Sequence, residues 1–108
     1  MRASRPSLSD LGRFSDPSLL ILSSLASGPK HGYAMITDIE QFSGTRLEVG
    51  TLYGALARLE KQGWIEPLEM IERRRPYRLT GTGREVLREQ LATMSKVLAT
   101  GMQRLSPA

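Results

Sequence analysis

Apolar side chains recur at helical spacing in four segments of the chain, and they predict four helices. The first begins at Asp16-Pro17, because Asp is a favoured N-cap and Pro suits the first helical position. It is apolar nearly all round, which predicts burial, and it ends at Gly28. The second begins near His31 and ends at Gly44. Its predicted apolar stripe consists of Tyr33, Met35, Ile36, Ile39 and Phe42.

The third predicted helix follows Val49, ends at Gly63, and has two different faces. One face is apolar at spacings of three and four, through Leu52, Ala55 or Leu56, and Leu59. The opposite face carries small residues near its start and cations near its end. A glycine inside a helix costs about 1 kcal/mol relative to alanine, so exposed glycines suggest that another molecule approaches closely. This face consists of Gly50, Thr51, Gly54, Ala57, Arg58 and Lys61.

Two short strands are predicted next, at residues 64–69 and 76–79, with a hairpin tip between them. Pro67 and Pro76 each lack a ladder donor, which suits short edge strands. Thr80 then caps a final helix, predicted from about Gly81 to Arg104. Apolar residues follow steps of four and three along this helix, which is a heptad seam. The seam consists of Leu87, Leu91, Met94, Leu98 and Leu105, with Gly101 in the remaining position.

This order of elements predicts a mainly α fold with a small β-hairpin, arranged as a winged helix-turn-helix with a C-terminal dimerisation helix. We expect residues 1–15 to form a flexible N-terminal arm, 16–80 the DNA-binding domain and 81–108 the dimerisation helix. The length of 108 residues suits one domain with a modest core.

Charge changes this picture through its position more than its amount. The formal net charge is only +4, but five arginines fall within twelve residues that contain no acid. Such a cluster attracts polyanions. On a hairpin tip, Arg73, Arg74 and Arg75 would project into a minor groove or along the phosphates; the alternative is a solvated basic loop. The five are Arg73, Arg74, Arg75, Arg78 and Arg84.

Composition excludes several other classes of protein. There is no cysteine and only one histidine, so the chain has no disulfide, no thiol nucleophile and no paired His ligands for a metal. His31 is interpreted as a structural residue at a helix start, and Trp64 as a core residue. With no nucleophile–base pair or phosphate-binding loop, we predict neither enzyme activity nor a cofactor. No apolar run reaches the roughly 18 residues of a membrane span and no cleavage site follows the N-terminus, so we predict a cytoplasmic protein.

The third helix and the basic hairpin together favour DNA binding. Small side chains near a helix N-terminus let its backbone enter the major groove. Thr51 can hydrogen-bond a base or a phosphate, and Tyr53 can pack on sugar. Arg58 and Lys61 can reach the DNA backbone farther along.

The last helix favours a homodimer. About 24 residues span roughly 36 Å, which is longer than the compact part of so small a domain. An apolar stripe of that length needs a second surface, although packing on its own domain is the alternative. Two-fold dimers are the commonest oligomers, and they read two half-sites about one helical turn apart. The predicted partners are therefore a second copy and a roughly palindromic double-stranded DNA operator.

The chain resembles PadR-like transcriptional regulators over roughly residues 18 to 105. The resemblance is carried by His31-Gly32-Tyr33, Gly50-Thr51-Leu52-Tyr53, Gly63-Trp64-Ile65 and the run from Arg75 to Thr80. It implies a winged helix, a dimer built from terminal helices, and a repressor released by an effector. It supports Tyr33, Thr51 and Tyr53 as DNA contacts beside the wing arginines.

Some members of that family hold flat aromatic compounds at the dimer interface, with an aromatic residue on the last helix. This chain has no aromatic residue from Thr82 to Ala108, so a pocket of that type is not expected. We predict a sequence-specific dimeric repressor that responds to a small-molecule effector of unassigned identity. The alternative is a winged-helix protein-interaction module without a specific DNA site.

Overall fold

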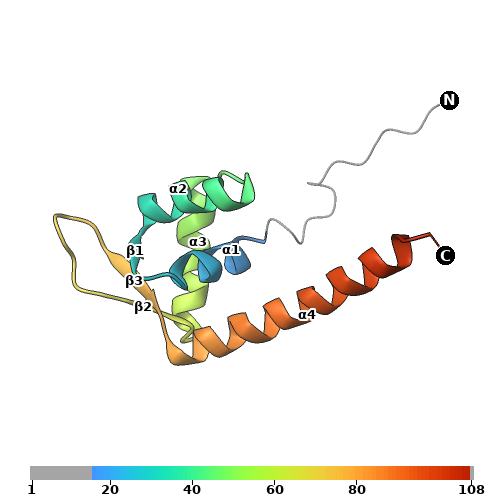
Figure 1. The fold of residues 1–108 in the computed structure, drawn as a ribbon. Coiled ribbons are helices and arrows are strands. Elements are labelled where there is room, and N and C mark those ends of the chain that lie inside the picture. The colour runs from blue at the N-terminus through green and yellow to red at the C-terminus, as the bar shows by residue number, and fades with distance from the viewer. Residues whose placement is uncertain (1–15, 108) are drawn as a thin grey trace.

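The computed structural model describes residues 16–107, and this part of the chain folds as helices around a small sheet (Figure 1). The predicted order of three helices, a hairpin and a long final helix is confirmed. The predicted arm at residues 1–15 lies outside the described residues. The elements are α1 (Pro17–Leu25), β1 (Lys30–His31), α2 (Gly32–Ser43), α3 (Val49–Lys61), β2 (Ile65–Pro67), β3 (Pro76–Leu79) and α4 (Gly81–Leu105).

Local capping residues fix three helix ends where the sequence predicted them. The Asp16 carboxylate accepts the backbone N–H of Ser18 at 2.9 Å, and the Thr80 hydroxyl accepts that of Gly83 at 3.0 Å. Gly44 ends α2 with a φ of 75°, a left-handed conformation in which glycine carries no steric penalty. These caps depend on neighbouring residues, and the sequence alone was enough to find them.

The core is built around α1, which packs against α2, α3 and α4. The predicted burial of α1 is confirmed, since four of its five leucine and isoleucine side chains are buried and the fifth is partly buried. The predicted apolar stripe of α3 is also confirmed, and Leu52, Ala55, Leu56 and Leu59 are each no more than 1% exposed. Trp64 is partly buried and packs against this core, as predicted.

A three-stranded antiparallel sheet in the order β1-β3-β2 joins the wing, which is the hairpin of β2 and β3 with residues 68–75 between them, to the helices. The strand β1 was not predicted, because two residues are too few to show alternation. It pairs Lys30 with Tyr77 and His31 with Pro76, so it ties the start of α2 to the wing. The strand β2 is shorter than the predicted 64–69 and ends at Pro67, which cannot donate to a ladder.

The predicted stripe of α2 was wrong at both ends. Tyr33 is 66% exposed and Phe42 is 51% exposed, whereas Met35, Ile36 and Ile39 are buried. The buried face begins at Gly32, and residues one position away on a helix of 3.6 residues per turn point about 100° to the side. Tyr33 is therefore free to contact another molecule.

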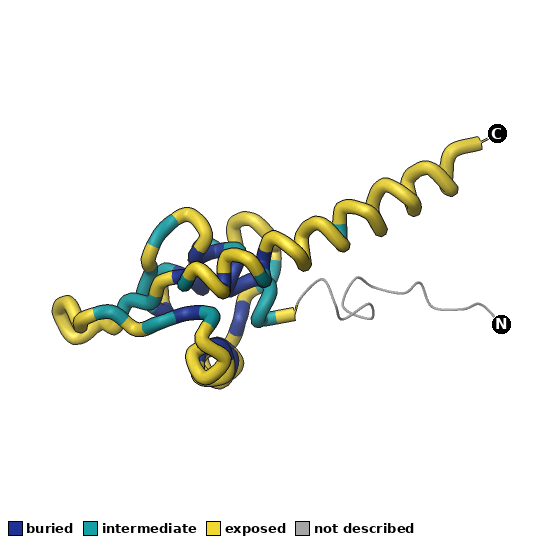
Figure 2. The backbone as a smooth tube through the Cα atoms, turned by 90° about the horizontal axis from the view of Figure 1, so that it is seen from below, coloured by how far each residue is buried: buried dark blue, intermediate teal, exposed yellow. Residues whose placement is uncertain are grey.

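The long helix α4 belongs to the domain only at its start. Leu87 is 5% exposed and lies in the core of its own chain, so this residue of the predicted seam is not available to a partner. Beyond it the helix leaves the domain, and Figure 2 shows its second half almost wholly exposed. The described residues extend 55 Å along their longest axis. None of the helices within 16–107 combines the length and apolar character needed to cross a membrane.

Candidate nucleic-acid interface

The exposed face of α3 is open, as a surface that meets another molecule must be. The predicted contact residues on this helix all lie on the exposed side. A Cβ at Gly50 would meet no atom within 4 Å, and one at Gly54 would meet only the Arg58 guanidinium at 3.9 Å. Small side chains thus leave the backbone of the first two turns approachable. The residues brought together here are Gly50, Thr51, Tyr53, Gly54, Arg58 and Lys61.

Tyr53 connects this face to the start of α2. Its ring is 50% exposed, but its hydroxyl lies against Gly32, where a Cβ would come within 2.6 Å of the oxygen. The glycine is therefore required by the close approach of the tyrosine. Tyr33, the next residue of α2, extends outward from the same junction. The two tyrosines predicted as DNA contacts therefore lie close together on one surface, where the start of α2 meets α3.

The wing ends in a tight two-residue turn. Ile71 and Arg74 exchange backbone hydrogen bonds of 2.8 and 2.9 Å across it. Glu72 and Arg73 occupy the turn with φ values of 49° and 68°. Positive φ at both central residues is the backbone of a type I′ turn, which usually contains Asn and Gly. The turn places Arg73 at the tip of the wing.

The three wing arginines are all exposed but point to different places. Arg73 lies in the turn, whereas the Arg75 guanidinium donates to the Leu68 carbonyl at 2.7 Å and follows the wing backbone. The Arg74 guanidinium lies 3.2 Å from Nε2 of His31, at the start of α2. The wing therefore offers cations along its length as well as at its tip.

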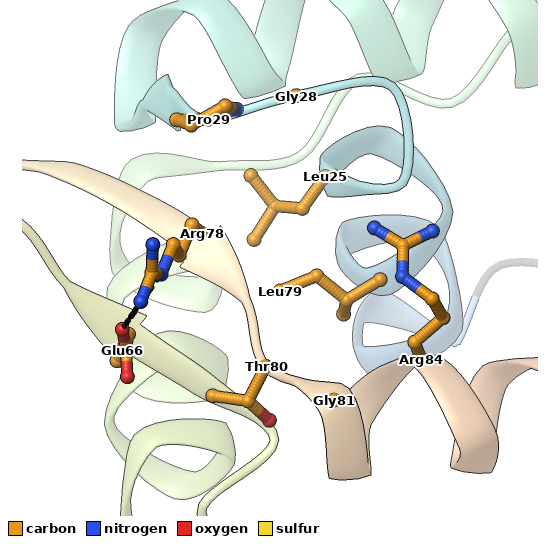
Figure 3. A pocket seen from close by; sticks show the side chains of 9 residues that line it. All are labelled: Leu25, Gly28, Pro29, Glu66, Arg78, Leu79, Thr80, Gly81 and Arg84. Carbon is orange, nitrogen blue, oxygen red and sulfur yellow. Dashed lines mark hydrogen bonds and ion pairs between the residues drawn. The ribbon is translucent and has the colours of Figure 1, made fainter.

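Arg78 is not part of this free positive charge. Its guanidinium donates to the Glu66 carboxylate at 2.6 Å, because β2 and β3 pair these two residues directly. Figure 3 shows this pair and Arg84 on either side of Leu79, around a hollow of about 450 Å³. The segment from Arg73 to Arg84 contains no acidic residue, but strand pairing places Glu66 beside it. Sequence order alone does not reveal this neighbour.

His31 is the N-cap of α2, as its predicted structural role requires, since Nδ1 accepts the backbone N–H of Ala34 at 3.3 Å. Its contact with Arg74 was missed by the sequence analysis, because 43 residues separate the two side chains. Across residues 16–107 no group of three or more His, Asp or Glu side chains is placed to hold a metal ion.

Tyr77 lies between the wing and α3. Its partial burial raises the pKa of the phenol above its ordinary value of 10.0, and the charges of Glu60 and Tyr53 raise it further. The Arg75 guanidinium acts in the opposite direction. Tyr77 therefore stays neutral at physiological pH, as suits a ring packed against the core.

The apolar stripe of α4 beyond Leu87 is the second candidate interface. Leu91, Leu98 and Leu105 are 44%, 65% and 82% exposed, and Met94 is partly buried. Met102, 61% exposed, lies on the same stripe one turn after Leu98. The sequence analysis missed Met102, although its spacing of four from Leu98 could have indicated it.

Comparison with known proteins agrees with this architecture. Residues 21–89 match the transcriptional regulator PadR-like family. A curated relative, an uncharacterized 37.1 kDa protein in transposon TN4556 of Streptomyces fradiae, is 49% identical over 85 residues, which cover 79% of this chain and 25% of that protein. This chain therefore spans only a quarter of that relative's length.

Two solved structures share the fold over most of their length. A PadR family transcription regulator from Clostridium difficile R20291 is 26% identical with a TM-score of 0.75, covering 83% of this chain and 98% of that one. A PadR family transcriptional regulator from Eggerthella lenta DSM 2243 is 32% identical with a TM-score of 0.71, covering 91% and 88%. The chain therefore belongs to the PadR-like family of transcriptional regulators.

Proposed function

We propose that the protein is a dimeric, sequence-specific repressor that binds a roughly palindromic operator in double-stranded DNA. The observation that carries the proposal is the open face of α3, where Gly50 and Gly54 leave the helix backbone approachable beside an exposed basic wing. A surface of this shape and charge suits a major groove flanked by phosphates. Repression, and release by a small-molecule effector, rest on the family resemblance.

Within this interface we assign base reading to α3. Thr51 lies in its first turn, where recognition helices meet base edges, and its hydroxyl can donate to or accept from a base. Tyr53 and Tyr33 present rings that pack on sugar and hydroxyls that donate to phosphate. Arg58 and Lys61, in the last turn, neutralise phosphates farther along.

The wing contributes affinity rather than base preference. Arg73 at the turn suits a narrow minor groove, which attracts arginine by its negative potential. Arg74 and Arg75 lie nearer the body of the domain, where they contact the phosphate backbone. Phosphate contacts fix the position of a protein on DNA without reading sequence.

We assign the exposed apolar stripe of α4 as the surface that binds a second copy of this chain. The stripe runs from Leu87, which is buried in the core, to Leu105, which is 82% exposed. Heptad spacing suits another helix of the same kind, and its central positions carry no charge. A two-fold pair would present two copies of α3 to successive turns of one DNA face.

Titrations over a range of salt concentrations test this function on a duplex selected by the wild-type protein. Each neutralised phosphate contributes about 0.9 to the slope of log affinity against log salt. Replacing Arg74 and Arg75 together by alanine should lower the slope and weaken all duplexes alike. Thr51→Ala should instead change which base is preferred.

Lys96→Ala is the matched control, because it removes one exposed cation from the side of α4 opposite the stripe and should leave the slope unchanged. A wild-type slope near zero would contradict DNA binding. A normal slope without any base preference would favour the protein-interaction module instead.

A further inference from the structure

Two side chains that both carry N–H groups meet where α2 joins the wing. Nε2 of His31 lies 3.2 Å from Nη1 of Arg74, a hydrogen-bonding distance. The pair stands at one end of a hollow of about 390 Å³ that runs along α2 toward Gln41. Arg74 is exposed and His31 is half-buried, so a ligand can reach both.

The neutral ring of His31 has one lone pair but two neighbours that donate, the backbone N–H of Ala34 and the guanidinium of Arg74. A neutral imidazole has one N–H and one lone pair, and a guanidinium has donors only. Because Nδ1 of His31 accepts the N–H of Ala34, the ring proton lies on Nε2 and faces the N–H groups of Arg74. In the other tautomer Nε2 accepts from Arg74, but Nδ1–H then faces the N–H of Ala34. One ring cannot satisfy both neighbours.

We propose that His31 and Arg74 together bind one backbone phosphate of the operator. This site rests on the proposed DNA-binding function and assigns His31 a contact in addition to its capping role. A phosphate oxygen accepts from Nε2–H and from the guanidinium at once, while Nδ1 continues to cap α2. The opposed donors thereby become two charge-assisted hydrogen bonds.

The surroundings place this site beside the base-reading helix. The Tyr53 hydroxyl packs against Gly32, the residue that follows His31, so the start of α2 adjoins the open face of α3. The backbone of His31 is also paired with Pro76 of β3, which holds it in register with the wing. In a helix-turn-helix the first of the two helices crosses the DNA backbone, and here that helix is α2.

The same hollow is lined by one acidic side chain, but this carboxylate is too far from His31 to repel a phosphate bound there. Asp38 lies two turns along α2 from His31, about 10 Å along the helix axis. Its carboxylate accepts the Ser24 hydroxyl at 2.7 Å and lies 4.0 Å from Nζ of Lys30. The negative charge of Asp38 is thus engaged on the side of α1, and Arg74 is the nearest charge to the His31 ring.

His31→Asn separates the two roles of the histidine. Asparagine is a favoured N-cap, so its side-chain oxygen still accepts the N–H of Ala34, but its amide is too short to reach the place of Nε2. We expect an unchanged melting temperature and an affinity for the selected operator that is roughly tenfold weaker. The salt slope should stay the same because no charge is removed, whereas Arg74→Ala should lower both affinity and slope.

Neutral methylphosphonate groups, placed one at a time along the operator, identify the contacted phosphate. One substitution should weaken the wild-type protein strongly and the His31→Asn variant by less, because only the Arg74 contact is left to lose there, while other positions affect both proteins alike. If His31→Asn binds the operator as tightly as wild type, or shows no such coupling at any phosphate, the site is overturned and the proposed function stands. If wild-type protein selects no duplex, both fall together.

Discussion

The two halves of α4 carry the same apolar stripe and have opposite surroundings. In the first half Leu87 is 5% exposed and Gly83 packs directly on the Trp64 carbonyl. In the second half Leu98 is 65% exposed and Leu105 is 82% exposed. One heptad pattern therefore serves the core of the domain first and an exterior surface afterwards. The spacing of a stripe identifies what is apolar but not what covers it.

The change occurs where α4 passes the end of its own domain. The Thr80 hydroxyl donates to the Gly63 carbonyl at 2.7 Å, and its backbone N–H donates to the Trp64 carbonyl at 3.0 Å. These bonds hold the first turns of α4 against the domain, where the helix contacts α1. The helix is 25 residues long, and its later turns extend past every other element (Figure 1).

The largest effect is expected from placing a charge on the exposed second half of α4. Leu98→Glu should abolish the dimer and weaken operator binding roughly 100-fold or more, because two linked half-sites become two separate binding events. Sedimentation equilibrium and DNA titration measure the two effects. Val97→Glu is the matched control, since Val97 is 66% exposed but lies beside the stripe. Equal behaviour of the two variants would contradict the assignment of the stripe to a second copy.

A methyl group on the packed half should act on folding instead. A Cβ at Gly83 would lie 1.9 Å from the Trp64 carbonyl oxygen, so Gly83→Ala must displace α4 from the domain. We expect the free energy of unfolding to fall by about 3 kcal/mol. Gly81→Ala, two residues earlier with nothing within 4 Å, should lose none of it. Chemical denaturation of both variants decides this, and equal stabilities would show that the packing of α4 is looser than described.

A smaller effect, a gain in stability, is expected at the turn of the wing. This turn is exposed like the second half of α4, but its stability depends on backbone conformation. Glu72 has a φ of 49°, a conformation that asparagine adopts at lower cost. Glu72→Asn should raise the free energy of unfolding by about 0.5 to 1 kcal/mol. Glu69→Asn removes the same charge from a wing position without positive φ and should leave stability unchanged. A matching gain in the control would assign the effect to charge.

The smallest effect is expected at Tyr77, on the boundary between packed and exposed regions. Its pKa is raised above 10.0 in the folded chain, so the fold favours the neutral phenol. This contribution to stability is complete below about pH 10 and is lost as pH rises through the folded pKa. Tyr77→Phe should therefore lose less stability than wild type between about pH 9 and pH 11, roughly one unit either side of the ordinary pKa. Denaturant titrations at both pH values measure it, and identical losses would contradict the raised pKa.

Features that depend on neighbouring residues were predictable from the sequence. The caps at Asp16 and Thr80, the glycine stop of α2 and the two faces of α3 each follow from residues a few positions apart. The candidate DNA-contact face could be predicted from the sequence for the same reason, because small residues and cations recur along one helix. Local chemistry and tertiary structure agree at these positions.

Features that depend on contacts between distant residues were not predictable. Exposure of Tyr33 depends on Gly32 taking the buried position against Tyr53, and burial of Leu87 depends on where α1 lies. The pairing of Arg78 with Glu66 follows from strand register, and the meeting of His31 with Arg74 follows from β1. The residues that refine the candidate site are those brought together by the fold.

Selection of duplexes from a random DNA library, by wild-type protein and by Leu98→Glu in parallel, tests most directly whether the domain reads DNA and α4 pairs two copies. We predict that wild type enriches a palindrome with half-sites about one helical turn apart, and that the variant enriches at most one half-site. Enrichment of the same single half-site by both proteins would contradict pairing through α4. Enrichment of nothing by folded wild-type protein would contradict the repressor itself.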